Sequence, residues 1–132
     1  NPKLTVRYPK RLKNSYQPIR YIVGDREIPH DYFIHDNSAP TMFTGKRTPR
    51  LILEDLLKLD VRTVLLETGS KLLKDFLDHD LVDEMVLYVA PTIIGQGKAL
   101  VEEILQANSN REYKISSVGL VGKDLRIKVS LR

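Results

Sequence analysis

The turn Glu67-Thr68-Gly69-Ser70 is the part of this sequence whose residue types and spacing best suit chemistry. It follows a short apolar run and leads into a helical pattern. The first N–H groups of a helix have no partner within the helix, and the helix dipole places partial positive charge there. Such a junction binds a phosphate without a cationic side chain, and Gly69 allows a ligand close to the backbone. The pattern also fits an ordinary helix capped by Ser70, and the dinucleotide pattern G-x-G-x-x-G is absent.

Glu67 stands at the carboxyl end of the strand predicted before this turn, where open α/β sheets usually bind their ligands. Its carboxylate is suited to accept hydrogen bonds from a sugar hydroxyl or an amide-like ring. The same carboxylate would also stabilise the dipole of the helix that follows. Residue type alone leaves both roles open.

The other reactive groups in the chain form no familiar catalytic or metal-binding pattern. His30, His35 and His79 lack the spacing of a metal site, and no G-x-S-x-G nucleophile elbow occurs. The absence of cysteine excludes disulfides, thiolate zinc sites and thiol nucleophiles. We therefore expect no bound metal. The acidic residues around Asp80 are typical of a solvated helix end.

The elements that must position the turn alternate between strands and helices. Strands are predicted at residues 18–23, 41–45, 63–66 and 85–90, and helices at 50–59, from Ser70 onward, and at 99–106. The unbroken apolar run 85–90 predicts a strand buried on both faces, and residues 26–40 predict a long loop. Residues 113–121 and 125–131 predict a C-terminal antiparallel hairpin. This order predicts an α/β fold with a mixed sheet.

Length and composition indicate a globular domain with a basic N-terminal segment. Of the 132 residues, 42% are hydrophobic and 29% charged, which argues against disordered, collagen-like and coiled-coil classes. Residues 1–26 carry seven Lys and Arg against one Asp, a formal charge of +6, and the other 106 residues sum to −2. Such a segment suits an anionic partner. Without a signal-peptide core or an apolar run near the roughly 18 residues of a membrane span, we expect a soluble cytoplasmic protein.

Three segments resemble the riboflavin-pathway pyrimidine reductases. Residues 1–7, N-P-K-L-T-V-R, are similar to their D-N-P-x-L-T-V-R segment without its leading Asp. The turn 67–70 resembles their E-(G/A)-G turn, and residues 81–97 resemble their L-V-D-E…Y-x-A-P…G-G-G stretch. The spacing agrees in all three, over essentially the whole chain. The sequence thus resembles the C-terminal reductase domain of the bifunctional riboflavin biosynthesis deaminase-reductase.

This resemblance implies a fold, an activity and partners. The fold would be dihydrofolate-reductase-like, with a mixed, mostly parallel sheet flanked by helices. The activity would be the NADPH-dependent reduction of the ribose of 5-amino-6-(5-phosphoribosylamino)uracil to a ribityl chain, by hydride transfer to C1′ of the ring-opened imine. The partners would be this phosphorylated pyrimidine and a second copy in a homodimer, with no nucleic acid and no membrane.

The resemblance also implies which residues contact each ligand. The substrate would contact Leu4, Arg7 and Glu67, with Arg7 on the ribose phosphate. The residues implied for NADPH are Thr44, Gly69, Ser70, Lys71, Leu72 and Leu73. No residue is assigned to proton transfer.

Some family features differ or have no counterpart in this sequence. Thr68 stands where the family has Gly or Ala, and Gln96 interrupts the glycine triplet. The family's N-terminal strands, with their S-L-D-G motif, and its zinc deaminase are not found. We therefore expect residues 1–132 to be a single domain that forms the C-terminal two-thirds of a reductase domain.

Three other functions stay open from the residues alone. The basic N-terminal segment also suits a nucleic-acid-binding module, whose affinity would fall steeply with salt. The strand at 85–90 and the terminal hairpin also suit a non-catalytic dimerisation domain. A reductase of the same fold acting on a folate or pterin is the remaining alternative, against which Arg7 as a phosphate ligand argues.

Overall fold

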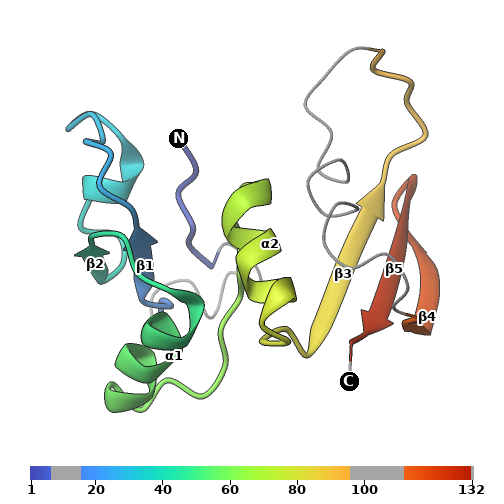
Figure 1. Ribbon diagram of the computed structural model, residues 1–132. Coiled ribbons are helices and arrows are strands. Elements are labelled where there is room, and N and C mark those ends of the chain that lie inside the picture. Colours follow the sequence, from blue (N-terminus) through green and yellow to red (C-terminus); the bar gives the residue numbers. More distant parts are fainter. Residues whose placement is uncertain (7–15, 96–111, 132) are drawn as a thin grey trace. The chain divides into compact units, whose positions relative to one another are not determined.

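The computed structural model describes residues 1–6, 16–95 and 112–131 (Figure 1). The chain divides into two compact units, Asn1–Arg47 and Thr48–Arg132, and each is described by itself. The helix predicted at 99–106 lies outside the described residues. The prediction that residues 1–132 are one domain, and part of a longer one, stays a prediction.

The first unit is built on two parallel strands, β1 (Arg20–Val23) and β2 (Thr41–Thr44). Both strands were expected from the β-rich runs at 18–23 and 41–45, and both are confirmed. The ladder pairs Arg20 with Thr41 and Val23 with Thr44, and it is extended by the Gly24 N–H, which donates to the Thr44 carbonyl at 3.0 Å. The predicted loop that joins the strands contains one turn of 3₁₀ helix, Phe33–His35.

Arg20 organises this unit from the first position of β1. Its side chain is 1% exposed, and its guanidinium donates hydrogen bonds to six acceptor atoms. These acceptors are Thr41 Oγ1 at 2.8 Å, the carbonyls of Lys3 (3.3 Å), Phe33 (2.9 Å), Asp36 (2.7 Å) and Ala39 (2.8 Å), and Asp36 Oδ1 at 3.0 Å. A buried cation needs a full set of partners, and the planar five-donor fork of arginine supplies the geometry for it.

The second unit begins with α1 (Pro49–Lys58), which confirms the helix predicted at 50–59. Thr48 is its N-cap, with the hydroxyl oxygen accepting from the Leu51 N–H at 3.4 Å, and Pro49 fills the first helical position, where no N–H is needed. Ile52 and Leu56 are each 4% exposed and form the buried side of the helix.

The second helix, α2 (Ser70–Asp78), also confirms its prediction, and it contacts α1. Its buried side chain is Phe76, at 3% exposed. Both helices end in the same way, because Asp60 and Asp80 follow them with φ values of 56° and 54°. In α2 the Leu81 N–H donates to the Phe76 carbonyl at 3.0 Å, which closes the left-handed end described for helix C-termini.

The strand predicted at residues 63–66 is wrong. These residues connect α1 to α2 without regular secondary structure and pair with no strand in the described part of the chain. Leu65 is 82% exposed and Val64 42% exposed. The apolar and β-branched residues favoured a strand locally, but a strand also needs a ladder partner, and local pattern does not supply one.

The rest of this unit is a three-stranded antiparallel sheet in the order β3-β5-β4 (Figure 1). The strands are β3 (Glu84–Val89), β4 (Lys114–Val121) and β5 (Asp124–Ser130). The β4-β5 pair confirms the C-terminal hairpin, with a two-residue turn at Gly122-Lys123. A bulge lies between Ile115 and Ser117, and the Ser116 hydroxyl donates to the Lys128 carbonyl there, at 3.1 Å.

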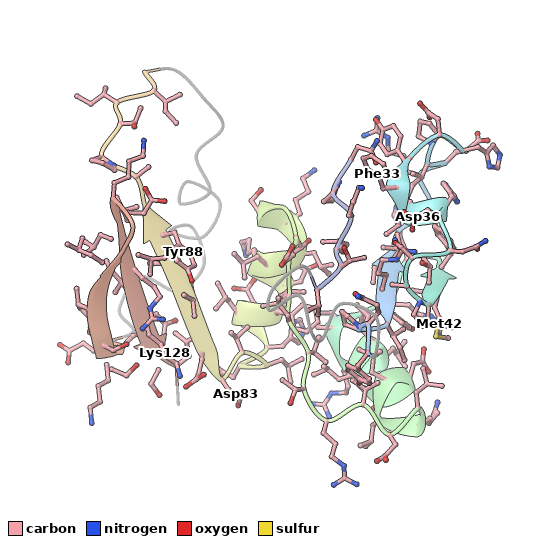
Figure 2. All side chains as sticks on the ribbon, turned by 180° about the vertical axis from the view of Figure 1, so that it is seen from behind. Phe33, Asp36, Met42, Asp83, Tyr88 and Lys128 are labelled. Atoms are coloured by element: carbon pink, nitrogen blue, oxygen red, sulfur yellow. The ribbon has the colours of Figure 1, made fainter. Side chains whose placement is uncertain are left out.

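The expectation that residues 85–90 form a strand buried on both faces is also wrong. In the antiparallel register, Val86 lies opposite Lys128 and Tyr88 opposite Arg126, so these side chains share the polar face of the sheet. Val86 is 47% and Tyr88 60% exposed. Figure 2 labels Tyr88 and Lys128 on this sheet, where the Lys128 ammonium lies 2.7 Å from Glu84 Oε1.

The chain is thus an α/β protein with one parallel and one antiparallel sheet among its described residues. The mostly parallel arrangement expected from the resemblance is not confirmed by this pairing.

The position of Arg20 gives a stability prediction for the first unit. We expect Arg20→Met to lower the free energy of unfolding by about 3 kcal/mol, because the buried Ala39 carbonyl and several half-buried carbonyls lose their donor and the half-buried Asp36 loses its ion pair. Arg62→Met is the matched control: Arg62 is 84% exposed and pairs with the exposed Asp60, so its loss is worth about 1 kcal/mol or less. Urea unfolding of the two variants measures the difference, and equal losses would contradict the role given to Arg20.

Asp36 makes part of this stability depend on pH. Its side chain is labelled in Figure 2. Its pKa lies below the ordinary value of 3.8, first because the Ser38 hydroxyl and N–H donate to Oδ1, and then because the Arg20 guanidinium donates to the same oxygen. Since the folded pKa is the lower one, this contribution is fully present above pH 3.8 and is lost as the pH falls through the folded value. We expect the unfolding free energy of Asp36→Asn to fall less steeply with decreasing pH below about pH 4 than that of the unaltered chain, as urea unfolding at a series of pH values would measure. The same pH dependence in both proteins would contradict the contribution assigned to Asp36.

Candidate functional site

The residues expected to bind ligands fall into two groups, one in each unit. Leu4 and Thr44 belong to the first unit, whereas Glu67 and the run Gly69–Leu73 belong to the second. Arg7 lies outside the described residues. Within the second unit, the predicted residues are brought together simply because they are contiguous in the chain.

In the second unit the group is the start of α2. Gly69 is the N-cap, with φ −75° and ψ 172°, and no side chain makes a capping hydrogen bond to the helix. The first intrahelical bond runs from the Leu73 N–H to the Gly69 carbonyl at 3.2 Å. Ser70 is therefore the first helical residue and not the cap, which corrects the alternative of a Ser70-capped helix. The N–H groups of the first turn are directed outward, as an anion site requires.

The fold itself does not require glycine at position 69. Its φ is one that any residue adopts, and an added Cβ would meet no atom within 4 Å. Glycine is thus not explained here by backbone strain or crowding. What it provides is open access to the N–H groups behind it.

The side chains around this helix start differ in their exposure. Glu67 and Lys71 are exposed, so a carboxylate and an ammonium flank the turn on its solvent side. Leu72 and Leu73 are half-buried, like much of the apolar side of α2. Leucine side chains offer nothing to a phosphate, so these two residues are suited to bind one only through their backbone.

In the first unit Thr44 lies at the carboxyl ends of β1 and β2, which meet at one edge because the strands are parallel. Thr44 ends β2, and its hydroxyl accepts from Arg47 Nε at 3.2 Å. The neighbouring Asp25 was missed by the sequence analysis. Its Oδ1 accepts the Lys46 N–H at 2.9 Å and lies only 2.8 Å from where a Cβ of residue 45 would sit. The pairing of Gly24-Asp25 after one strand with Gly45 after the next was the signal that could have revealed it.

Leu4 lies in the extended N-terminal segment of the same unit. It is half-buried and has φ 48°, the left-handed region that costs a leucine energy. The Lys3 carbonyl, just before it, accepts from Arg20, and the Val6 N–H, two residues after it, donates to Gln17 Oε1 at 2.8 Å. The backbone around Leu4 is therefore held on both sides.

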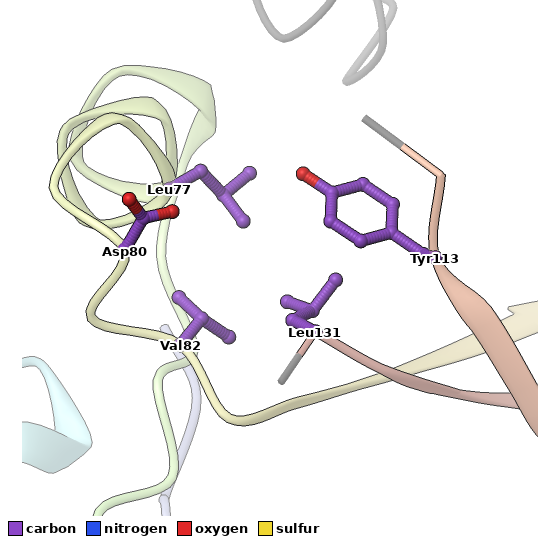
Figure 3. A pocket seen from close by; sticks show the side chains of 5 residues that line it. All are labelled: Leu77, Asp80, Val82, Tyr113 and Leu131. Atoms are coloured by element: carbon purple, nitrogen blue, oxygen red, sulfur yellow. The ribbon is translucent and has the colours of Figure 1, made fainter. Parts of the chain in front are cut away.

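The second unit also contains a small hollow. It is lined by Leu77, Asp80, Val82, Tyr113 and Leu131 (Figure 3). None of the residues predicted to bind a ligand lines it. Its apolar walls come from the end of α2, the following turn and the terminal hairpin.

The described ranges offer neither a metal-binding cluster nor a membrane-spanning helix. Residues 1–6, 16–95 and 112–131 contain no group of three or more His, Asp or Glu side chains placed to hold a metal ion. In the same ranges, none of the helices has the length and apolar character to cross a membrane.

Comparison with known protein families identifies the family of this chain. The family model described as the RibD C-terminal domain matches residues 1–126. The chain belongs to the RibD C-terminal domain family. The match covers both units, including the segment of Leu4 and the start of α2.

Named relatives agree with this membership. The chain is 31% identical over 134 residues to the riboflavin biosynthesis protein RibD of Mycobacterium tuberculosis, covering 100% of this chain and 39% of the relative. It is 30% identical over 131 residues to the 5-amino-6-(5-phosphoribosylamino)uracil reductase of Buchnera aphidicola, covering 89% and 63%. The chain thus spans about two-fifths of the length of the RibD protein it matches.

Solved structures of RibD proteins are also similar. A RibD of Acinetobacter baumannii superposes with a TM-score of 0.68 at 25% identity, over 86% of this chain and 38% of that one. A deaminase/reductase of Thermotoga maritima gives a TM-score of 0.72 at 21% identity, over 98% and 41%. The RibD C-terminal fold is therefore shared.

The close approach at Gly45 gives a prediction for the strand-end site. We expect Gly45→Ala to lower the unfolding free energy by about 0.5–1 kcal/mol, because the new methyl group must displace the flexible Asp25 carboxylate and so break its exposed hydrogen bond with the Lys46 N–H. Gly119→Ala, where a Cβ meets nothing within 4 Å, is the control. In an Asp25→Ala background the cost of Gly45→Ala should largely vanish, as a double-mutant cycle would show. Persistence of the full cost would mean that another contact is responsible.

Proposed function

We propose that this RibD C-terminal domain is an NADPH-dependent reductase that converts the ribose of 5-amino-6-(5-phosphoribosylamino)uracil to a ribityl chain. The observation that carries the proposal is the family match over residues 1–126, in which a relative named for this reductase shares 30% identity. The alternatives of a nucleic-acid-binding module and a dimerisation domain gain no support from these matches.

The start of α2 is the proposed site of the cofactor phosphates. An uncapped helix N-terminus with open space at Gly69 fits a pyrophosphate, because outward N–H groups and the helix dipole both favour an anion. Ser70, Lys71, Leu72 and Leu73 would contribute N–H groups, with the exposed Lys71 adding a cation. Thr44, at the edge formed by the carboxyl ends of β1 and β2, is the further proposed cofactor contact.

The substrate is proposed to contact Leu4, Arg7 and Glu67. Arg7 would pair with the ribose phosphate in a charge-assisted contact, and the exposed Glu67 would accept hydrogen bonds from the sugar or the ring. When bound, NADPH supplies the hydride that reduces C1′ of the ring-opened imine. The protein's part is then to hold the two ligands in a reactive orientation. We assign no residue to proton transfer.

The finer features of the family are part of the same proposal. The complete sheet would be dihydrofolate-reductase-like and mostly parallel. The protein would work in the cytoplasm as a homodimer. The similarity of fold to the solved RibD chains supports the first of these.

Glycine 69 provides the sharpest test of the cofactor site. Gly69→Val keeps an allowed φ and its Cβ meets no atom within 4 Å, so we expect the chain to fold with only the modest loss of helix stability that valine causes at an N-cap, but the side chain blocks approach to the N–H groups behind it. We expect the Kd for NADPH to rise about tenfold or more, since about 1.4 kcal/mol of lost binding is already tenfold. Titration of NADPH fluorescence measures it.

Gly119→Val is the matched control, because its Cβ also meets open space and it lies on β4, away from the proposed site residues in sequence. Its NADPH affinity should equal that of the unaltered chain. Equal affinities in all three proteins would place the phosphates elsewhere. A failure of the unaltered chain to bind NADPH, or to oxidise it with the phosphoribosylaminouracil, would contradict the proposed function itself.

A further inference from the structure

The N-terminal segment Asn1–Val6 is held against the first unit at both of its ends. Near its start, the Phe33 N–H donates to Asn1 Oδ1 at 2.8 Å, and the Lys3 ammonium lies 4.4 Å from the centre of the Phe33 ring. The Lys3 carbonyl then accepts from Arg20 Nη1 at 3.3 Å. This end is therefore fixed by three contacts, two of which come from the loop around Phe33.

The other end is held by the side chain of Gln17. The Val6 N–H donates to Gln17 Oε1 at 2.8 Å, and Gln17 Nε2 donates to the Val6 carbonyl at 3.4 Å. A primary amide carries an acceptor and a donor side by side, so it occupies both backbone groups of one residue, much as a neighbouring strand would. Gln17 is half-buried, which limits the access of competing water.

Between these two ends lies Leu4, with φ 48°. A leucine in the left-handed region is strained, and such a conformation persists only where the surroundings over-determine it. The contacts of Lys3 on one side and of Val6 on the other provide that constraint. Leu4 is also the one residue of this segment, among those described, that the proposed function places on the substrate.

We propose that Gln17 is a positioning residue for substrate binding. It keeps the backbone of Val6 in place, and through it the strained conformation that presents Leu4. This inference rests on the proposed function, because it takes Leu4 as a substrate contact. Gln17 lies eleven residues from Val6 in the sequence, so the sequence alone does not suggest this role.

The test compares Gln17→Met and Gln17→Glu with the unaltered chain in steady-state kinetics. Met keeps the length of the side chain and removes both hydrogen bonds, whereas Glu keeps an acceptor for the Val6 N–H. We expect Gln17→Met to raise the KM for 5-amino-6-(5-phosphoribosylamino)uracil by about tenfold, with the KM for NADPH unchanged, because misplacing one ligand's contacts costs on the order of ten- to a hundredfold. Gln17→Glu should lie between the two.

A second readout does not depend on activity. Hydrogen exchange of the Val6 amide should accelerate in Gln17→Met and stay close to that of the unaltered chain in Gln17→Glu. Tyr16→Ala is the control: this neighbour is 77% exposed, and its loss should change neither KM value nor the Val6 exchange.

The outcomes separate the two proposals. Loss of NADPH and substrate affinity together in Gln17→Met, with a lower Tm, would overturn the positioning role and make Gln17 a general structural residue. An unchanged substrate KM with faster Val6 exchange would also overturn it, because the segment would then move without consequence. Absence of reductase activity in the unaltered chain would instead contradict the proposed function, while the Val6 exchange would still report on the contact.

Discussion

The burial of one guanidinium group sets the geometry of the whole first unit. Arg20 cannot be stripped of water without partners, and its six acceptors come from β2, the 3₁₀ turn, the loop after it and the N-terminal segment. These pieces are far apart in sequence and include only two short strands. Satisfying one buried cation therefore fixes the path of the loop between β1 and β2. It also fixes the segment on which the substrate contact Leu4 is proposed to lie.

The second unit places its candidate site by a different means. There the groups proposed to bind the ligand are backbone N–H groups at the start of α2. Side chains contribute mainly by leaving these N–H groups accessible. Apolar packing of Phe76 on the inner side of the helix orients its axis, and glycine at the N-cap leaves the outer end open. One unit thus relies on a dense set of side-chain hydrogen bonds, and the other on the backbone N–H groups at the start of a helix.

Sequence patterns predicted what depends on neighbours along the chain. The helices over Ile52 and Phe76, with the second beginning directly after Gly69, and the hairpin at Gly122 follow from periodicity and turn residues, and all are present. The strand around Leu65 failed because pairing depends on a distant partner. Burial of the strand over Tyr88 failed because its register against β5 was unknown. The carboxylate of Asp25 and the amide of Gln17 were missed for the same reason, since their contacts lie 21 and 11 residues away.

The open surroundings of Gly69 bear on how such a protein can change over generations. At most positions that serve a ligand, a substitution alters folding and binding together, so the two effects are selected as one. Residue 69 has an ordinary backbone conformation and free space around it, so folding places almost no demand on its identity. Under the proposed function, drift at this position is restrained mainly by ligand binding. It is therefore a place where affinity for an anion can be gained, lost or retuned by one codon without a compensating change elsewhere in the fold.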